Sequence, residues 1–356
     1  MHIRILAVTG IKPKDNLICQ VWYGNYSDPL VSKAMSEDTG RGLNFQRVHY
    51  QERLYSCEIP QIPDMYPRFV SLNTKKCGQS AMLVPVTIPE KQQVYEIGVC
   101  VVVAYGNLKP TPLVEWVELN KILGVSEINV YNSRVNSEAR AVFDYYSERG
   151  VMKVRKAAPS VDSWCKWCQK LTVIAALNDC MYRNMYRYNH LMVIDFDEAI
   201  IPTKSYSLPD MLSIVGKTWK TRPPSYLFRN TYYFLDSEPK YKTPSYLITS
   251  RYVARQKYSE PGYSPKSIID PRRCMVMQNH YCMKRTPDVS GSFALYVKPD
   301  YATSHHYKKC HFKKEECAAM LKQTFEEEAA LRYREKLNKT VPIALEELKN
   351  LESVIH

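Results

Sequence analysis

Between residues 94 and 195 the sequence alternates apolar runs with stretches of helical periodicity. The first run, VYEIGVCVVVAYG at 94–106, is almost continuously apolar, which is typical of a strand covered on both faces. The order predicts β-α-β-α-β-α-β, whose right-handed crossovers require a parallel sheet. Ligands of such sheets bind outside the carboxyl ends of the strands. The pattern therefore predicts both an α/β fold and the edge where its site lies.

Helix boundaries support this interpretation. Thr111-Pro112 can open one helix and Gly124 stands just past its end, while Ser137 can cap a second helix that stops at Gly150. The predicted strands are 94–106, 126–132, 151–155 and 190–195, and the predicted helices are 113–123, 138–149 and 163–187.

The sequence before residue 94 has a different pattern. Short β-branched or aromatic runs are separated by Pro, Gly, Asn and Asp, which predicts a small all-β module over residues 1–93. We expect it to be sandwich-like, and carbohydrate binding is one role that such a module could have. Its predicted strands are 3–8, 18–23, 44–50, 53–59, 68–72 and 81–88.

After Pro202 the pattern is mixed, and the second domain is predicted to span 94–356 with helices at its C-terminal end. The predicted elements are a helix at 208–215, strands at 225–234, 245–254, 266–270, 273–278 and 292–297, and helix over most of 312–353.

An acidic cluster ends the strand at 190–195, in the stretch HLMVIDFDEAIIP. Asp195 and Asp197 stand one residue apart at the carboxyl end, where unpaired carboxylates would repel and resist desolvation. A divalent cation removes that penalty, and Mg²⁺ or Mn²⁺ prefers few protein oxygens together with phosphate oxygens. The cluster therefore predicts a metal that binds a diphosphate, although a solvated turn could also carry these charges.

Other classes of protein fit less well. The GxGxxG of a Rossmann dehydrogenase is absent from AYGNLKP at 104–110, and no GxxxxGK[ST] is present. A phosphatase with an Asp nucleophile also uses Asp-x-Asp, usually on the first strand with Thr or Val two residues later, where this chain has Ala199. A nucleic-acid binder would explain the net charge of +13 but not the acidic cluster.

The chain has 11 cysteines and a single CxxC, at 165–168, which does not make a zinc site by itself. In an oxidising compartment several cysteines would pair, and we expect disulfides among Cys165, Cys168, Cys274, Cys282, Cys310 and Cys317. Sequons at Asn25 and Asn338 permit a secretory route. No apolar run reaches the roughly 18 residues of a membrane helix.

Five motifs in order resemble glycosyltransferase family 92, which includes β1,4-galactosyltransferases. They are VEWVELNKILGVSEINVYN, QKLTVIAALNDCMYR, LMVIDFDEAIIP, SPKSIIDP and HHYK. The resemblance covers about residues 95–312. It implies a GT-A type catalytic domain, Rossmann-like with a mostly parallel central sheet, and inverting transfer of galactose from UDP-galactose with Mn²⁺.

The resemblance also implies partners and a location. The acceptor would be a terminal galactose or fucose of a glycan on a glycoprotein or glycolipid, and the bond formed would be a β1,4 linkage. Family members are usually type II membrane proteins of the Golgi lumen, so a membrane anchor would precede this chain and Met1 would not be the natural start. A homodimer is possible, and no nucleic-acid partner is expected. A lectin without enzyme activity remains the rival class.

The resemblance assigns the metal to three residues. Asp195 and Asp197 match the family's Asp-x-Asp, and a third ligand, a His near the C-terminal end of the fold, is usual in GT-A enzymes. Of His305 and His306 we favour His306, which directly precedes Tyr307. The family usually has Arg at the next position, where this chain has Lys308, so a two-pronged phosphate contact is not expected there.

The remaining candidates bind the nucleotide or act as the base. Nucleotide contacts are expected at the ends of the first two strands, on the helix before the fourth strand, and in the SPKSI segment and beyond it: Tyr105, Asn107, Tyr131, Asn132, Gln169, Asp179, Lys266 and His280. Inversion needs a carboxylate that takes the proton of the acceptor hydroxyl. Glu260 and Asp236 are the preferred candidates, with Glu198, Glu238 and Asp270 as alternatives.

Overall fold

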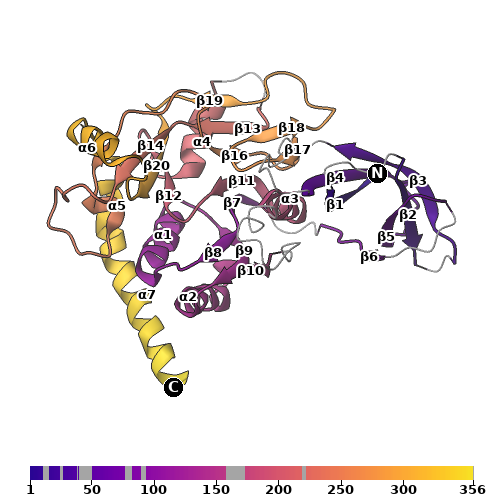
Figure 1. Ribbon diagram of the computed structural model, residues 1–356, viewed down its shortest axis with the longest axis horizontal. Helices are drawn as coiled ribbons and strands as arrows, with labels where there is room; N and C mark the ends of the chain where they lie inside the picture. Colours follow the sequence, from indigo (N-terminus) through magenta and orange to yellow (C-terminus); the bar gives the residue numbers. More distant parts are fainter. Residues whose placement is uncertain are drawn as a thin grey trace.

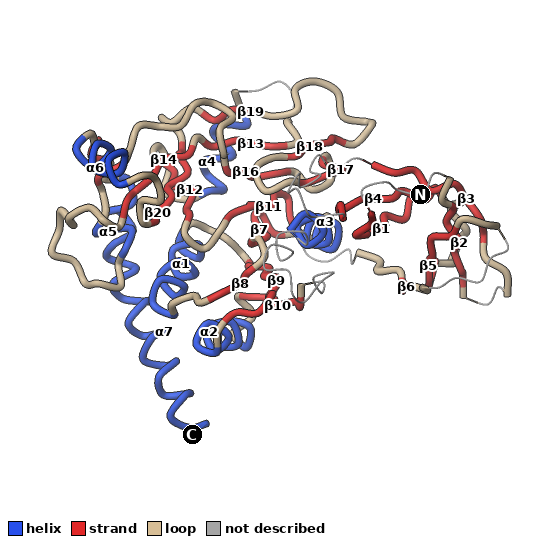
Figure 2. Tube along the Cα trace, viewed as in Figure 1, coloured by secondary structure: helices blue, strands red, loops and turns tan. Residues whose placement is uncertain are grey.

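The computed structural model describes residues 1–10, 16–24, 27–37, 39, 50–76, 82–89, 94–157, 173–218 and 222–355. Figure 1 shows an N-terminal sheet on one side, an α/β domain beside it, and the long helix α7 (Arg334–Ile355) that ends the chain. Figure 2 shows the same division, with strands alone in the first part and helices around the strands of the second. No helix of the described residues is long and apolar enough to cross a membrane.

The described residues of the N-terminal part form strands alone, in agreement with the predicted all-β module, but the strands make one antiparallel sheet and not the expected sandwich. Its strands follow the order β1-β4-β3-β2-β5-β6, and a disulfide between Cys19 and Cys57 joins β2 to β4 in the core. The strand predicted at 81–88 shrinks to two residues, and the one predicted at 44–50 lies almost wholly outside the described residues. The strands are β1 (His2–Gly10), β2 (Ile18–Tyr23), β3 (Leu30–Glu37), β4 (Tyr50–Glu58), β5 (Pro67–Asn73) and β6 (Val84–Pro85).

The central sheet of the α/β domain has the order β10-β9-β7-β11-β16-β13-β19, and β8 pairs with β9. The strands predicted between 94 and 195 pair in parallel with one another. By contrast, β16 is antiparallel to both of its neighbours, so the whole sheet is mixed. The bounds are β7 (Tyr95–Val101), β8 (Ala104–Gly106), β9 (Glu127–Val135), β10 (Met152–Lys156), β11 (Tyr188–Ile194), β13 (Ser225–Phe228), β16 (Lys266–Ile269) and β19 (Leu295–Val297).

Close packing explains two glycines of this domain. A Cβ on Gly98 of β7 would lie 2.9 Å from the ring of Tyr188 on the neighbouring strand β11, so only glycine fits there. Gly124 has φ +92° just past the helix α1, a conformation that glycine adopts without strain. The crossover helices are α1 (Pro110–Ile122), α2 (Ser137–Glu148), α3 (Val173–Asn184) and α4 (Leu208–Gly216).

A second, smaller sheet has the order β12-β20-β14-β15-β21. The sequence did not predict β12 or β20, because ATSHHYK of β20 is polar in composition although most of the strand is buried. This sheet matters for the site, since β12 begins directly after Asp197. Its strands are β12 (Glu198–Pro202), β14 (Asn230–Phe234), β15 (Ala254–Arg255), β20 (Ala302–Lys308) and β21 (Phe325–Glu326), and a separate hairpin consists of β17 (Cys274–Met277) and β18 (Cys282–Arg285).

Two predictions are wrong in detail, and a third can be checked only in part. The strand expected at 245–254 is mostly turn and the short helix α5 (Ile248–Arg251), because the buried carboxylate of Glu115 accepts hydrogen bonds from the first backbone N–H groups of that helix. Asn136, not Ser137, precedes α2 as its cap residue. The helix expected at 163–187 is described as α3, and residues 158–172 lie outside the described part.

The C-terminal region contains α6 (Lys314–Lys322), a 3-10 turn at Ala329–Tyr333 and α7, which packs against α1.

The predicted disulfides are confirmed where the structure describes them. Cys274 pairs with Cys282 and Cys310 pairs with Cys317. A further bridge, Cys100–Cys180, ties β7 to α3 next to the sheet. The CxxC at 165–168 lies outside the described residues.

The fold should lose stability in acid partly through His190 on β11. Burial and the neighbouring guanidinium groups of Arg222 and Arg272 lower the pKa of His190 to about 3. In the unfolded chain this histidine takes up a proton near pH 6.5, so its contribution is complete above that value and is lost as the pH falls towards 3. Urea unfolding at pH 7.5, 5.5 and 4.5 should show a slope smaller by up to about 1.4 kcal/mol per pH unit in His190→Gln than in the wild type. Equal slopes would refute this account.

Candidate active site

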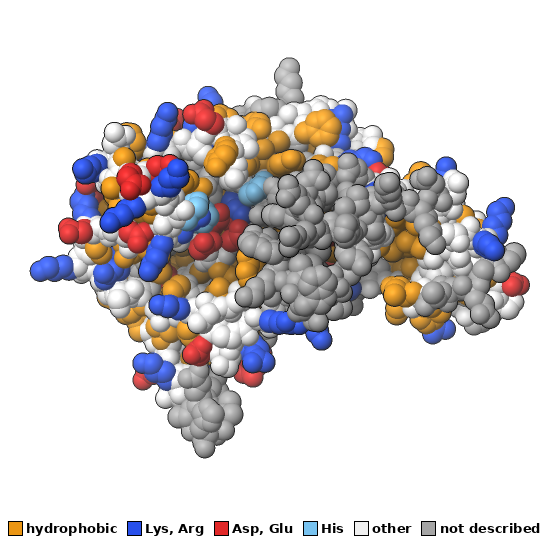
Figure 3. Space-filling model, in the orientation of Figure 1, with side chains coloured by type: hydrophobic (Ala, Val, Ile, Leu, Met, Phe, Trp, Pro, Cys, Tyr) orange, Lys and Arg blue, Asp and Glu red, His pale blue; other side chains and the backbone are white. Residues whose placement is uncertain are grey.

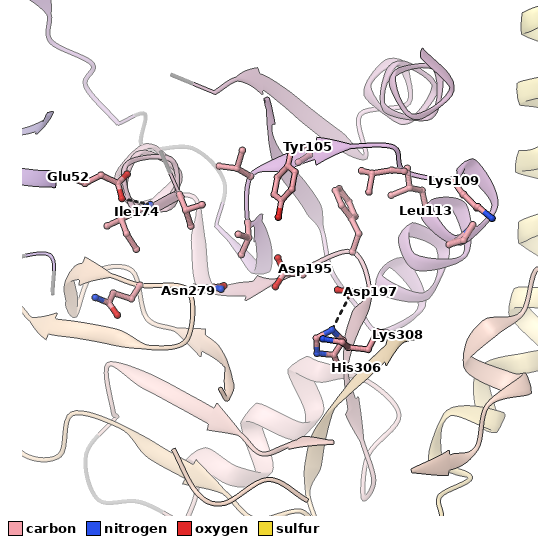
Figure 4. Close-up of a pocket in the computed structure, with 18 residues that line it drawn as sticks. Glu52, Tyr105, Lys109, Leu113, Ile174, Asp195, Asp197, Asn279, His306 and Lys308 are labelled. Atoms are coloured by element: carbon pink, nitrogen blue, oxygen red, sulfur yellow. Dashed lines mark hydrogen bonds and ion pairs between the residues drawn. The ribbon is translucent and has the colours of Figure 1, made fainter. Parts of the chain in front are cut away.

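A cavity of about 630 Å³ opens at the carboxyl ends of β7 and β11, where the sequence predicted the site. Figure 3 shows carboxylate and histidine side chains gathered in the middle of this face. In Figure 4 the turn that carries Asp195 and Asp197 lies in the centre, with Tyr105 on one side of it and His306 on the other. The lining residues come from both sheets and from the N-terminal module.

Phe196, the residue between Asp195 and Asp197, packs the turn that carries both aspartates (the aspartate turn) against neighbouring aromatic side chains. The ring of Phe196 packs against Trp116 at 4.9 Å between centroids and against Phe143 at 5.8 Å. The indole N–H of Trp116 donates to the backbone carbonyl of Glu198, 2.8 Å away. The backbone turns here, since the N–H of Glu198 donates to the carbonyl of Asp195 at 3.2 Å, and the packed ring of Phe196 fixes this turn so that both aspartates line the cavity.

Lys266 lies beneath the turn with its ammonium group buried. Its Nζ is 2.6 Å from Oδ2 of Asp195 and 2.9 Å from Oε2 of Glu198, and it also donates to Oδ1 of Asn279 at 3.2 Å. Burial disfavours the charged ammonium, but the carboxylates of Asp195 and Glu198 outweigh it and raise the pKa of Lys266. The sequence proposed Lys266 for the diphosphate; in the structure it binds the acidic cluster.

His306 stands between two carboxylates. Its Nε2 lies 3.0 Å from Oδ2 of Asp197 and its Nδ1 lies 3.1 Å from Oε1 of the buried Glu198. Partial burial opposes ionisation of Asp197, but the hydrogen bond with His306 prevails and lowers the pKa of that carboxyl group.

The side chains of Asp197 and His306 are placed so that they can both bind one divalent metal ion. Cis ligands of an octahedral ion with bonds of roughly 2.0–2.2 Å lie about 3 Å apart, which matches the separation of Asp197 Oδ2 and His306 Nε2. Glu198 can accept the Nδ1 proton of His306, which leaves Nε2 for the ion. Within the described ranges no group of three His, Cys, Asp or Glu side chains is already arranged around a metal. Phosphate oxygens and water would have to complete the sphere.

His305, the neighbouring candidate, faces the opposite side of β20. It is fully buried, and its ring stacks on Tyr233 at 4.5 Å between centroids. The strand alternation explains the difference, because successive side chains point to opposite faces of a sheet. The structure thus brings Asp195, Asp197 and His306 together and excludes His305 from the cavity.

Of the residues predicted to bind the nucleotide, Tyr105 lies at the cavity and others do not. Tyr105 lines the cavity and is half exposed, whereas Asn107 is exposed two residues beyond it and outside the lining. His280 donates a hydrogen bond from Nδ1 to the backbone carbonyl of Pro265, 2.9 Å away. Gln169 lies outside the described residues.

A second group of predicted residues forms a structural network next to the cavity. The hydroxyl of Tyr131 donates to Oδ2 of Asp179 at 2.6 Å, and Arg183 binds the same oxygen at 2.7 Å. Asn132 accepts a hydrogen bond from the backbone of Val135. None of Tyr131, Asn132 and Asp179 is among the lining residues, so their nucleotide roles stay predictions.

Both preferred candidates for the base lie outside the cavity lining. Glu260 is exposed, in the loop after β15. Asp236 is exposed and accepts a hydrogen bond from the backbone N–H of Cys310, 2.6 Å away. The base therefore stays a hypothesis.

The sequence did not predict that the N-terminal module reaches the cavity. Glu52 of β4 lines it, and its buried carboxylate accepts hydrogen bonds from the first N–H groups of α3, those of Ile174 at 3.2 Å and Ala175 at 2.7 Å. Burial raises the pKa of Glu52 to about 8, although both hydrogen bonds favour the ionised form. Gln278, also in the lining, donates to the carbonyl of Thr39 at 2.6 Å. No local pattern reveals partners so far apart in the chain.

Comparison with known proteins names the family to which this fold and its cavity belong. Residues 95–342 match the model of glycosyltransferase family 92. Because the match covers more than half of the chain, the protein belongs to glycosyltransferase family 92.

Similarity to individual proteins is more distant. The chain is 22% identical over 229 residues to the beta-1,4-galactosyltransferase galt-1 of Caenorhabditis elegans, a match that covers 60% of this chain and 50% of that protein. Among solved structures, a 4-diphosphocytidyl-2C-methyl-D-erythritol synthase matches 51% of this chain and 76% of its own at 10% identity, with a TM-score of 0.27. A mycobacterial protein matches 39% and 41% at 16% identity, with a TM-score of 0.24. These scores are too low to relate the folds.

Replacement of the two adjacent histidines should separate metal binding from folding. We expect His306→Ala to weaken Mn²⁺ binding in the presence of UDP by roughly 10- to 100-fold, the scale found when metal sites are disturbed. His305→Ala should leave that affinity within about threefold but lower the free energy of unfolding by about 1–3 kcal/mol, since it removes a buried, stacked ring. Calorimetric titration and urea unfolding measure the two effects. Weaker metal binding in His305→Ala alone would move the ligand by one residue.

Proposed function

We propose that this glycosyltransferase transfers galactose from UDP-galactose to a terminal galactose or fucose of a glycan, with Mn²⁺ and with inversion to a β1,4 linkage. The observation that carries the metal and donor part is the pairing of Asp197 with His306 at the carboxyl edge of the parallel strands. The similarity to a protein named beta-1,4-galactosyltransferase supports the choice of sugar and linkage.

The residues of the chain divide the work. Asp195, Asp197 and His306 would hold the ion, which when bound neutralises the charge that develops on the departing diphosphate. Lys266 and Glu198 keep the cluster in place beneath it. Lys109 and Lys308 line the cavity and add positive charge around the diphosphate, and Tyr105 offers a ring to the uridine. A GT-A type fold agrees with this arrangement.

The acceptor hydroxyl must lose its proton on the face opposite the leaving group. Glu260 and Asp236 stay our hypotheses for that base, although each would have to approach the cavity when substrates bind. Replacing each with its amide and comparing transfer with hydrolysis of the donor would identify a base, because only transfer to a sugar hydroxyl needs that group in place.

We further propose that the protein works in the Golgi lumen, on glycoproteins or glycolipids. The support is the cystines within the described residues, Cys19–Cys57, Cys100–Cys180, Cys274–Cys282 and Cys310–Cys317, since disulfides persist in oxidising compartments. Mass mapping of the protein from secretory cells should find them oxidised, and reduced cysteines there would contradict the location.

The deciding experiment measures UDP release from a panel of UDP-sugars. We expect UDP-galactose with Mn²⁺ to give slow release alone and faster release with galactose- or fucose-terminated glycans, and chelation of the metal should stop both. Release from a different UDP-sugar would correct the donor. No release from any UDP-sugar with any acceptor would contradict the proposal.

A further inference from the structure

One face of the small sheet adjoins the cavity at His306. In the register of that sheet, Glu198 of β12 and Tyr232 of β14 are both directly opposite His306 of β20. Directly paired residues project to the same face, so the face that carries the acidic cluster also carries Tyr232. The ring centroids of Tyr232 and His306 are 5.4 Å apart.

Further aromatic side chains surround Tyr232. Its ring stacks on Phe234 at 5.7 Å and meets the edges of His311 at 6.1 Å and Phe312 at 6.3 Å. The ammonium group of Lys308 lies 5.3 Å from the centre of the Tyr232 ring. We call Tyr232, His311 and Phe312, together with Lys308, the aromatic platform.

Core packing does not account for this platform. The rings on the opposite face of the same strands, those of Tyr233, His305 and Tyr307, are buried and stacked on one another. By contrast, Phe312 is 37% exposed and His311 is exposed as well. Partly exposed, mutually packed rings beside a polar site are typical of a surface that receives a ligand.

The loop that carries the platform is fixed in place. The disulfide Cys310–Cys317 closes the loop around His311 and Phe312. Asp236, at the end of β14, accepts a hydrogen bond from the backbone N–H of Cys310 at 2.6 Å. In this structure Asp236, which stays a hypothesis for the base, also anchors the loop of the platform. A ligand that stacks on these rings would find them already ordered, which lowers the entropy lost on binding.

We propose that the aromatic platform is the binding site for the acceptor sugar, a pyranose with one apolar C–H face such as galactose. This inference rests on the proposed function. The C–H face of the sugar would lie on Tyr232 and Phe312, and the hydroxyl groups at its rim would reach the polar atoms of Lys308 and His311. The platform begins within 6 Å of His306, so the sugar bound there lies next to the reacting diphosphate.

The position of the platform favours the acceptor over the uridine. Tyr105 and His306 lie on opposite sides of the aspartate turn (Figure 4), and the platform extends from the His306 side. Of the platform, Lys308 lines the cavity on the diphosphate side, whereas Tyr232, His311 and Phe312 lie outside the lining. Donor and acceptor would then meet from opposite directions, as an inverting displacement requires.

The test uses Phe312→Ala, with Phe312→Tyr as the conservative variant. Tyr66→Ala is the matched control, because Tyr66 is an aromatic residue of the N-terminal module that is 63% exposed. We expect Phe312→Ala to raise the acceptor KM by roughly 5- to 30-fold, the range for a residue that anchors a ligand, while donor hydrolysis without acceptor stays unchanged. Phe312→Tyr and Tyr66→Ala should behave as the wild type.

A second readout does not depend on catalysis. Saturation-transfer NMR with methyl β-D-galactopyranoside or methyl α-L-fucopyranoside, without donor, should show binding to the wild type and to Tyr66→Ala but not to Phe312→Ala. Calorimetry with UDP and Mn²⁺ should give the same affinity for all of them. If no UDP-sugar is a substrate, the proposed function fails while the NMR result still decides the platform. Sugar binding that survives in Phe312→Ala, is lost in Tyr66→Ala, or is absent from the wild type would overturn the inference, as would weaker UDP binding in Phe312→Ala.

Discussion

Replacement of Asp197 with Asn is expected to lower sugar transfer by roughly 10²- to 10⁴-fold, because a metal ion supplies several kcal/mol of charge stabilisation and each 1.4 kcal/mol is a factor of ten in rate. The amide keeps the shape of the side chain but loses the charge that faces Nε2 of His306. The carboxyl group is half exposed, so the fold should stay intact. Transfer assays across a range of Mn²⁺ concentrations measure the effect.

Asp300→Asn is the matched control for this change, since Asp300 is an exposed carboxylate outside the cavity lining. Transfer and Mn²⁺ dependence should be those of the wild type in this variant. Urea unfolding should give free energies within about 1 kcal/mol for the wild type and both variants. An Asp197→Asn protein that turns over at the normal rate and still needs metal would remove Asp197 from the site.

Lys266→Met should have the largest effect on stability, lowering the free energy of unfolding by about 3–5 kcal/mol. Removing one partner of a buried ion pair leaves the other charge uncompensated. Here the side chains of Lys266 and Glu198 are each no more than 3% exposed, and Asp195 binds the same ammonium group. Methionine keeps most of the volume, so the loss reflects charge more than packing.

The double variant Lys266→Met/Glu198→Gln tests whether charge is the cause. It removes the buried carboxylate that the single change leaves unpaired, so we expect it to recover at least about 1 kcal/mol over Lys266→Met, with a coupling energy measured by the double-mutant cycle. Glu198→Gln alone supplies the fourth corner. Additive effects of the single changes would show that Lys266 does not neutralise Glu198, and unchanged stability in Lys266→Met would contradict the buried network altogether.

The order of strands and helices between 94 and 195 could be predicted because each element carries its own periodicity. The site edge followed from the same pattern, since parallel strands place their carboxyl ends together. β20 could not be predicted in this way. Its residues are polar, and they are buried because they pair with β12 and β14 and meet partners from distant parts of the chain.

The candidate site was predictable to the extent that it lies in short motifs. Asp195 and Asp197 are visible as a strand-ending cluster, and the structure places His306 beside them. The roles of Lys266 and Asp236 were not visible, because a sequence shows that a residue is charged but not which group it binds. Lys266 turns out to bind two carboxylates, and Asp236 a backbone N–H group.

Glu52 limits how the N-terminal module of this chain can be exchanged for another one. The stretch shared with the family begins at residue 95, yet a side chain more than forty positions earlier caps α3 and forms part of the cavity wall. A chimera that exchanges everything before residue 95 for another module would leave the first N–H groups of α3 without their buried acceptor. Such a chimera should therefore be less stable than the parent chain, unless the incoming module supplies a carboxylate at the same point. The two parts of this chain are thus a single unit for engineering, although the border of the family match would divide them.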